Sequence, residues 1–579
     1  MILNNTYFEE LKEQITNQEK WDRAHFHVFN HEAGTGKSRS AHQIIGEMAK
    51  DHPFRVLYVQ RFVRDDELDN TVLAINQHAG KTIAERFAKE DTQKEVRKKR
   101  AEEAQVLCIT HKMYSQICKD EHQELIRNRQ ILIIDEYPDL LERITVSLED
   151  ICYLWGYYPT HGFDVIEELA KDFREKLYSY ESRALTQIKT MELVEFNSTQ
   201  YEKYRTAIPA IKKKISDKAH EKLLNKFEQV MKNGCFFYEG KFYTFDNQYE
   251  YKMLNNNIIL DANAGFDFRY ELFHKFIVRN QDKVFDYSNS TFMHFEINTG
   301  KKDLAQYINF PEKVLDTISL EDRKSVLLIT DMANKENVEG SLCYHFSQYG
   351  DTLLEIENRM SCKFSVDYFG NIIGVNQYRD YDTVVVMKTP NFDYLTYALT
   401  YLFYQTKNNR PVESVPIFSH DGVENIRKAT VAGEIYQAIK RINRDNSQNS
   451  QIYVFTSNQD AIDIVLYQLP NIQYRKEKMD LVSKRKYDSS NRKESSLFEK
   501  NIEQIKNLLI ELKGQGISSV KKKELREKVG VSDPAYFSKI LGVMGLFFEQ
   551  LNIINSGQKL ILIHDPNTED LDRNLGKSA

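Results

Sequence analysis

Short apolar runs alternate with longer amphipathic segments in the first part of the chain. The runs lie at 26–28, 55–59, 106–111 and 131–134. In the last of these, four consecutive aliphatic residues place apolar side chains on both faces, which is typical of a central strand covered on both sides. Strands that alternate with helical segments predict a doubly wound parallel sheet, with ligands at the carboxyl ends of its strands.

The strand signal fades between residues 140 and 257, where long polar helical segments such as 211–231 dominate. The sheet pattern resumes with the apolar run at 257–260. We therefore interpret the intervening stretch as a helical insertion in the first sheet domain. A lid, a clamp and a surface for a protein partner are all compatible with it, and the sequence does not distinguish them.

A second series of apolar runs, at 325–330, 382–387 and 451–456, predicts another α/β sheet domain without a phosphate loop of its own. Residues 471–500 follow with nine Lys/Arg against five Asp/Glu and little apolar content, which indicates an exposed basic linker. The expected domains are 1–275 with the insertion at about 140–257, 276–470, the linker at 471–500, and 501–579.

The junction between the first predicted strand and the next helix carries a phosphate-binding pattern. Glycines let backbone N–H groups approach an anion, the helix N-terminus favours negative charge, and a lysine reaches the terminal phosphates. His31 replaces the first glycine of the full pattern, and a glycine turn that precedes a lysine by chance is the alternative. The predicted nucleotide-binding residues are Gly34, Thr35, Gly36, Lys37 and Ser38.

Two acidic residues follow the central strand. Asp135 lies where a carboxylate beside the phosphate loop holds Mg²⁺, for which Ser38 is the other expected ligand. Glu136 is then placed to orient and deprotonate an attacking water during hydrolysis. An apolar run that ends in Asp is common and alone is weak evidence for a nucleotide site. It becomes strong evidence because the phosphate-loop pattern with Lys37 and Ser38 lies upstream.

A helix in the second half presents Gln437, Arg441 and Arg444 at spacings of four and seven residues, hence on one face. Guanidinium groups that project from one domain toward a phosphate held by another are arginine fingers. A basic helix face exposed to water is the alternative for these residues.

The order of six segments resembles the superfamily 2 helicases and translocases. GTGKS, TH, DE, LDANA, GVN and QAIKRINR run from Gly34 to Arg444 in that family's order. The resemblance implies two RecA-like domains that enclose ATP and lie across a nucleic-acid strand. It also implies nucleic-acid contact or coupling at Thr110, His111, Asp261, Asn263, Gly374 and Asn376. Asn263 stands where threonine is usual, Asn376 where Asp is usual and Lys440 where glycine is common.

The last segment resembles a winged helix-turn-helix module. Helices are expected at 502–512, 521–529 and 535–548, followed by a hairpin from the apolar runs 551–554 and 560–563. Tyr536, Ser538 and Lys539 on the third helix would then face a DNA groove. Protein contacts, or packing as a rigid accessory, are the alternatives.

Composition narrows the function classes. A net charge of -6 gives no global basic bias, so any surface for a polyanion must be local. The six cysteines form no CxxC pair, which argues against structural zinc or a disulfide framework. No window approaches the ~18 apolar residues of a membrane helix, and the N-terminus turns acidic too early for a signal peptide. We expect a soluble, cytoplasmic protein.

Together these patterns favour an ATP-dependent DNA helicase or translocase that uses ATP and Mg²⁺. An RNA-directed ATPase of the same superfamily is one alternative, and only the expected wing favours DNA over RNA. A nucleotide-dependent regulatory or defence scaffold with little unwinding is another. The insertion and the C-terminal module are candidate surfaces for a protein partner, and no membrane partner is expected.

Overall fold

The computed structural model describes residues 5–61, 67–88, 94–158, 161–184, 190–196, 199–307, 310–372, 376–481, 489–531, 533–542 and 544–563. The chain divides into two compact units. The large one spans residues 1–304 and 309–480, and the small one consists mainly of residues 481–579.

A seven-stranded parallel sheet organises the first half of the large unit, with strand order β11-β1-β10-β5-β2-β4-β3. Its strands are β1 (Phe26–Phe29), β2 (Val56–Gln60), β3 (Ala84–Phe87), β4 (Val106–Thr110), β5 (Ile131–Asp135), β10 (Asn256–Leu260) and β11 (Phe276–Arg279). All residues of β1, β2, β4 and β10 are buried, as expected for strands covered on both faces. Because β11 pairs with β1, the first sheet extends past residue 275, where we expected its domain to end.

Helices cover both faces of this sheet. One face packs against α1 (Asn5–Thr16), α2 (Lys37–Asp51) and α3 (Glu67–Ala79), the other against α4 (Lys94–Glu103) and α5 (His111–Cys118). The apolar side of α2 includes Ile44, Ile45 and Met48, the positions that the sequence pattern indicated, together with Ala41 and Ala49. The doubly wound parallel fold expected for the first domain is confirmed.

A six-stranded parallel sheet organises the second half, with strand order β14-β13-β15-β17-β12-β18. Its strands are β12 (Thr291–Phe295), β13 (Ser325–Thr330), β14 (Lys363–Tyr368), β15 (Thr383–Val386), β17 (Gln451–Phe455) and β18 (Gln473–Glu477). Its helices are α11 (Phe310–Thr317), α12 (Lys335–His345), α13 (Leu353–Met360), α16 (Asp421–Ile439) and α17 (Gln459–Tyr467). The large unit therefore holds two RecA-like parallel-sheet domains, as predicted.

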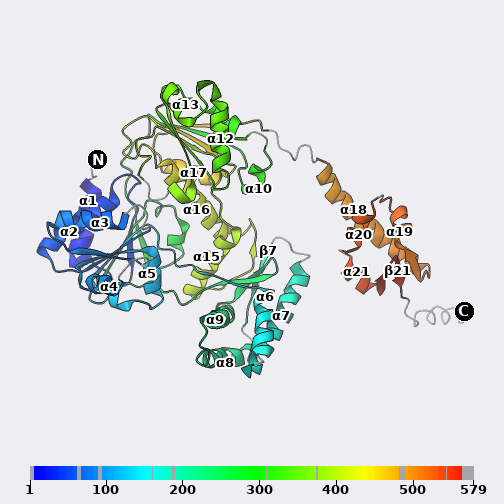
Figure 1. The fold of residues 1–579 in the computed structure, drawn as a ribbon. Coiled ribbons are helices and arrows are strands. Elements are labelled where there is room, and N and C mark those ends of the chain that lie inside the picture. The colour runs from blue at the N-terminus through cyan, green and yellow to red at the C-terminus, as the bar shows by residue number, and fades with distance from the viewer. Residues whose placement is uncertain are drawn as a thin grey trace, which may run out of the picture. The chain divides into compact units, whose positions relative to one another are not determined.

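Helices make up most of the regular structure between β5 and β10, as predicted, but the stretch also contains strands that the sequence pattern did not indicate. Four helices, α6 (Leu148–Tyr157), α7 (Asp164–Ala184), α8 (Glu202–Lys212) and α9 (Lys218–Asn233), accompany four antiparallel strands (Figure 1). The strands are β6 (Arg143–Val146), β7 (Thr190–Val194), β8 (Cys235–Tyr238) and β9 (Lys241–Phe245). Glu239 and Gly240, both with positive φ, form the two-residue turn of the β8–β9 hairpin.

A segment of the second half is built into the first half. Helix α15 (Tyr394–Lys407) packs in the same apolar core as β1, β5 and α5, and the Tyr404 hydroxyl lies 3.0 Å from that of Tyr251. The following strand β16 (Val415–Pro416) pairs antiparallel with β7 of the insertion. The insertion therefore completes its five-stranded sheet with residues that lie more than 150 positions away in sequence, at 415–416.

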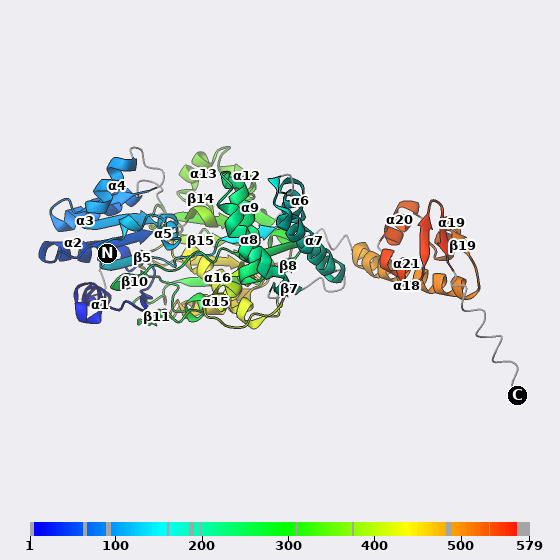
Figure 2. The same cartoon turned by 90° about the horizontal axis from the view of Figure 1, so that it is seen from below.

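The small unit contains α18 (Ser489–Gly514), β19 (Ser519–Lys521), α19 (Lys522–Lys528), α20 (Pro534–Gly542), α21 (Gly545–Gln550), β20 (Ile553–Ser556) and β21 (Lys559–Leu562). Figure 2 shows these helices packed against a small sheet. Its strands are antiparallel and lie in the order β19-β21-β20. The third helix expected at 535–548 is instead α20 and α21, with glycines at the end of one and the start of the other. The hairpin lies where it was expected.

The basic linker expected at 471–500 is partly regular structure. Strand β18 ends the second sheet, and α18 begins at Ser489. All five residues of β18 are exposed, so this edge strand lacks the apolar pattern by which buried strands are predicted.

Candidate nucleotide site between the two sheets

The predicted phosphate loop joins β1 to the N-terminus of α2. Gly34 and Gly36 have φ values of +93° and +88°, a region that glycine enters without strain. The turn lets Lys37 begin α2, so the helix N-terminus opens onto the loop. A Cβ atom on Gly34 would collide with the carbonyl oxygen of Arg444, so the second half contacts the loop directly.

Ser38 and Asp135, the two expected Mg²⁺ ligands, lie side by side. The Ser38 hydroxyl donates to Asp135 Oδ2 at 2.5 Å, and the Tyr58 hydroxyl donates to the same oxygen at 3.3 Å. Burial raises the pKa of Asp135, while the bond from Ser38 and the charge of Lys37 act in the opposite direction. Hydroxyl and carboxylate oxygens are ligands that suit Mg²⁺.

Lys37 faces three carboxylates. Burial lowers the pKa of its ammonium group, and Asp135, Asp261 and Glu136 oppose that shift. Its ammonium group donates no hydrogen bond to any residue that the structure describes. A lysine that is surrounded by acidic groups yet bonded to none of them suits a role in binding an anion.

Glu136 follows β5 in a left-handed conformation with φ of +72°, and its N–H donates to the Leu260 carbonyl at 3.0 Å. Its carboxylate pairs with Arg61, with 3.1 Å between Nη1 and Oε2. Burial acts to raise the pKa of Glu136, but Arg61 and Arg441 outweigh burial and the pKa is lowered. Glu136 is therefore charged at neutral pH and able to accept a proton.

Arg441 and Arg444 do not lie on the same helix as Gln437, so the prediction of one helical face with all three residues is wrong. Gln437 lies in α16, but this helix ends at Ile439, and Arg441 and Arg444 lie in the turn that follows. Asn443, with φ of +39°, donates its N–H to the Tyr381 carbonyl and bends the chain there. Arg441 faces Glu136, and the Arg444 guanidinium donates to Asn376 Oδ1.

Several buried polar atoms at this cleft lack a hydrogen-bond partner among the described residues. They are Gln437 Oε1, Arg441 Nε, Arg444 Nε and Asn263 Oδ1. Burial lowers the pKa of Arg444 to about 10, and Arg441 and Arg379 add to that shift. Buried groups of this kind are normally bonded. The two arginine N–H groups are donors and fit an anionic ligand, whereas the two amide oxygens are acceptors and fit a water or hydroxyl group. Guanidinium groups match phosphate oxygens in geometry and charge.

His31, at the position of the missing glycine, is buried in an aromatic stack. Its ring lies 4.3 Å from that of Tyr7 with an interplanar angle of 2°, and edge-on to Phe29 at 5.4 Å. Burial and the charge of Lys37 lower its pKa to about 3. Neutral His31 thus packs as an aromatic residue behind the loop.

The residues expected to contact nucleic acid in the first half lie at this cleft with partners inside the protein. Thr110 caps α5, and His111 Nε2 lies 2.8 Å from the Asp135 carbonyl oxygen. Asp261 is buried, its pKa is raised to about 6 by burial, and it accepts a bond of 2.8 Å from Tyr270. Asn263 lies against Gly433, where an added Cβ would be 3.2 Å from its Nδ2.

The other residues expected to contact nucleic acid lie in the second half of the large unit and in the small unit. Asn376 bonds Arg444, and Gly374 lies outside the described residues. In the small unit, Tyr536 is partly buried against the apolar core, and Lys539 lies on α20. The role of these residues toward nucleic acid stays a prediction.

Three site residues were not singled out for chemistry by sequence reasoning. Arg61 follows directly on β2, and its place at the carboxyl end of a parallel strand is a signal that could have identified it. Glu32 and Lys440 flank the two motifs but have partners far away in sequence. No local pattern identifies those two residues.

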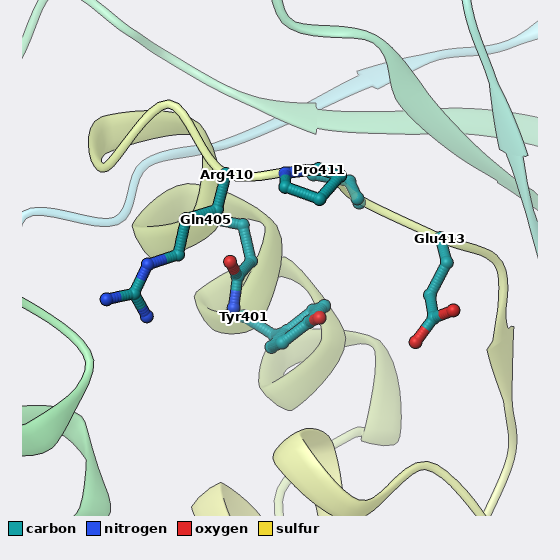
Figure 3. A pocket seen from close by; sticks show the side chains of 6 residues that line it. Tyr401, Gln405, Arg410, Pro411 and Glu413 are labelled. Carbon is teal, nitrogen blue, oxygen red and sulfur yellow. The ribbon is translucent and has the colours of Figure 1, made fainter.

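A separate hollow of about 390 Å³ lies between α15 and the segment that leads to β16. Figure 3 shows Arg410 and Glu413 at its two ends, with Tyr401 and Gln405 between them. None of the predicted phosphate-loop residues lines it.

Within the described ranges, no group of three His, Cys, Asp or Glu side chains is arranged to hold a metal ion. No helix in the described part of the chain is both long and apolar enough to cross a membrane.

No protein-family model matches the chain, and no curated protein matches it in sequence. Solved structures with a similar fold include Xpd4 from S. tokodaii, with 14% identity over 81% of this chain and 100% of that one and a TM-score of 0.46. The Mycobacterium smegmatis helicase Lhr, bound to ssDNA and AMP-PNP, has 10% identity over 97% and 60%, with a TM-score of 0.36. The L327V variant of S. cerevisiae Dbp5, bound to RNA and ADP BeF3, has 8% identity over 82% of this chain and 90% of that one, with a TM-score of 0.35.

The fold follows from this chain's own topology. Two parallel sheets lie in one compact unit, with the phosphate loop on the first and the arginine-bearing turn of the second in contact with it. The chain therefore has two RecA-like domains, with the phosphate loop of the first facing the arginine-bearing turn of the second.

Proposed function

We propose that the chain is an ATP-dependent DNA helicase or translocase that hydrolyses ATP between its two RecA-like domains. The observation that carries this proposal is the position of Arg441 and Arg444. They come from the second half, their Nε atoms lack partners among the described residues, and they lie beside Glu136 and Gly34 of the first half.

The residues of the first half divide the chemistry of hydrolysis among themselves. The backbone of Gly34 to Gly36 and the ammonium group of Lys37 bind the phosphates. Ser38 and Asp135 would hold Mg²⁺, which when bound neutralises phosphate charge. Glu136 orients the attacking water and accepts its proton.

The second half completes the site. Arg441 and Arg444 stabilise the negative charge that develops on the phosphate oxygens in the transition state, an effect worth about 10³–10⁵ in kcat for arginine fingers. Gln437, at the end of α16, lies beside them with an acceptor free of partners among the described residues. Separation of the two domains after hydrolysis would remove these groups, and repeated closure would move a nucleic-acid strand.

The preference for DNA rests on the small unit. Its order of helices, followed by the hairpin of β20 and β21, supports a winged-helix-like module, and α20 is the helix that would enter a groove. Partly buried Tyr536 and exposed Ser538 lie on this helix.

ATP turnover tests the proposal when it is measured without nucleic acid and with single-stranded DNA, duplex DNA or RNA. We expect turnover that DNA stimulates and that Lys37→Ala abolishes. Stimulation by RNA alone would assign the chain to the RNA-directed ATPases. Slow turnover indifferent to every nucleic acid would favour a regulatory or defence scaffold, and undiminished turnover by Lys37→Ala would refute the ATP site itself.

A further inference from the structure

Glu32, one residue from the aromatic stack of His31, is a buried carboxylate with no exposed surface. It accepts hydrogen bonds from the N–H groups of Val284 at 2.9 Å and Phe285 at 3.3 Å. It also accepts one from the Tyr287 hydroxyl at 2.8 Å. All three donors belong to the segment between β11 and β12, which connects the two sheets. Glu32 thus binds the phosphate loop to the interdomain connection.

Lys440 meets the same segment from the second half. Its ammonium group donates to the Tyr287 hydroxyl at 3.0 Å and lies 4.9 and 4.8 Å from the ring centroids of Phe285 and Tyr287. Lys440 is 5% exposed and directly precedes Arg441. One tyrosine hydroxyl therefore accepts from Lys440 and donates to Glu32.

This relay spans three parts of the site: the phosphate loop, the interdomain connection and the arginine turn. Burial of a carboxylate and an ammonium group is costly unless both are bonded, so the relay is stable only in one arrangement. If the arginine turn moved relative to the phosphate loop, at least one of the two charges would lose its partner.

We propose that Glu32, Tyr287 and Lys440 form an interdomain latch that sets the position of Arg441 and Arg444 over the phosphate loop. The three are positioning residues, since they act through the arginines and the loop. This inference rests on the proposed ATPase function. The latch would couple nucleotide binding at the phosphate loop to the closure of the two domains.

Tyr287→Phe and Lys440→Met test the latch in the full chain. Tyr204→Phe is the matched control, because it removes another buried tyrosine hydroxyl, which donates to Asp172 in the insertion at 2.5 Å. The measurements are kcat and KM for ATP, the Kd of a fluorescent ADP analogue, and Tm for each variant.

We expect Tyr287→Phe and Lys440→Met to lower kcat about tenfold, with the Kd for ADP changed less than about twofold, because the phosphate contacts of Lys37 and Ser38 are untouched. The double variant should lose less than the product of the two single losses, since both changes break one relay. Tyr204→Phe should leave kcat at the wild-type value.

The latch is refuted if kcat is unchanged in the two variants, or if Tyr204→Phe lowers kcat equally for the same loss of Tm. Equal loss of ADP affinity and kcat would refute positioning as well, because it would place the effect in nucleotide binding. Failure of the proposed function gives a different result, namely turnover that survives Lys37→Ala.

Discussion

The two halves of the nucleotide site differ in how they are held. In the first half, Ser38 and Tyr58 both donate to Asp135, and Glu136 is held by its backbone N–H and by Arg61. In the second half, Gln437, Arg441 and Arg444 each retain a buried polar atom without a partner in the described structure.

Under the proposed function, this difference assigns nucleotide binding to the first half and control of turnover to the second. The first half is assembled by its own sheet, because the phosphate loop follows β1, the acidic pair follows β5, and the two strands flank β10. The second half contributes a turn whose polar groups depend on the other domain and on what binds between them. Changes in the first half should therefore abolish binding or chemistry outright, and changes in the second should act on turnover.

The largest effect is expected for Lys37→Ala, which removes the cation that faces the bound phosphates. We expect turnover to fall by about 10³-fold or more, since charge stabilisation by the loop supplies much of the catalysis. Steady-state ATPase assays measure this loss. Lys50→Ala, at an exposed position in the last turn of the same helix, is the control and should leave ATP turnover unchanged.

Glu136→Gln keeps the shape of the side chain and removes the proton acceptor. We expect kcat to fall by about 10²–10⁴-fold while nucleotide affinity is retained, because general bases contribute about that much. Presteady-state turnover and equilibrium binding of a fluorescent nucleotide separate the two effects. A parallel loss of binding would show that Glu136 holds the nucleotide and is not the base.

Gly34→Ala probes the contact between the halves. Gly34 has a positive φ, and the new methyl group would collide with the Arg444 carbonyl, so we expect a loss of about 1–3 kcal/mol in stability. Gly156→Ala in α6 is the control, because nothing lies within 4 Å of the added Cβ. Helical alanine should stabilise by up to about 1 kcal/mol there. Thermal or denaturant unfolding measures both, and equal effects would contradict a close contact at Gly34.

The smallest effect concerns pH. Burial lowers the pKa of Lys440 from 10.5 to about 8, with Glu32 and Asp445 opposing and Arg444 adding to the shift. Above pH 8 the folded chain releases this proton before the unfolded chain does, so stability contributed by this residue rises between about pH 8 and 10.5. Relative to Lys440→Met, the wild type should therefore gain in Tm as pH increases from 7 to 9.5. A pH-independent difference would show that the ammonium group is not buried.

Sequence reasoning named the residues of the first half that the structure brings together at the cleft, and their role in binding a nucleotide stays a prediction. The phosphate loop and the acidic pair each follow a buried apolar strand. The hydrophobic pattern that predicts the strand therefore also locates the candidate functional residues Lys37 and Asp135. Both parallel sheets were predicted for the same reason. The strands β6 to β9 were missed because they are short and antiparallel, and their sheet is completed by β16 from a distant part of the chain.

The rest of the site depends on contacts between residues far apart in the sequence, which no local sequence pattern predicts. Arg441 and Arg444 were expected on a helix, because a spacing of four and seven residues fits one, but the backbone turns after Ile439. Glu32 lies 255 positions from Tyr287, and Lys440 lies 153 positions from it. Only the packing of the two sheets brings these three side chains together.

The central claim is that one ATP site is shared by two domains, and Arg441→Ala tests it most directly. Single-turnover hydrolysis and the Kd for ATP should be measured on the same preparation. We expect the Kd to stay within about threefold of the wild-type value while the hydrolysis rate falls by about 10²-fold or more. A wild-type hydrolysis rate with normal ATP binding would contradict the shared site.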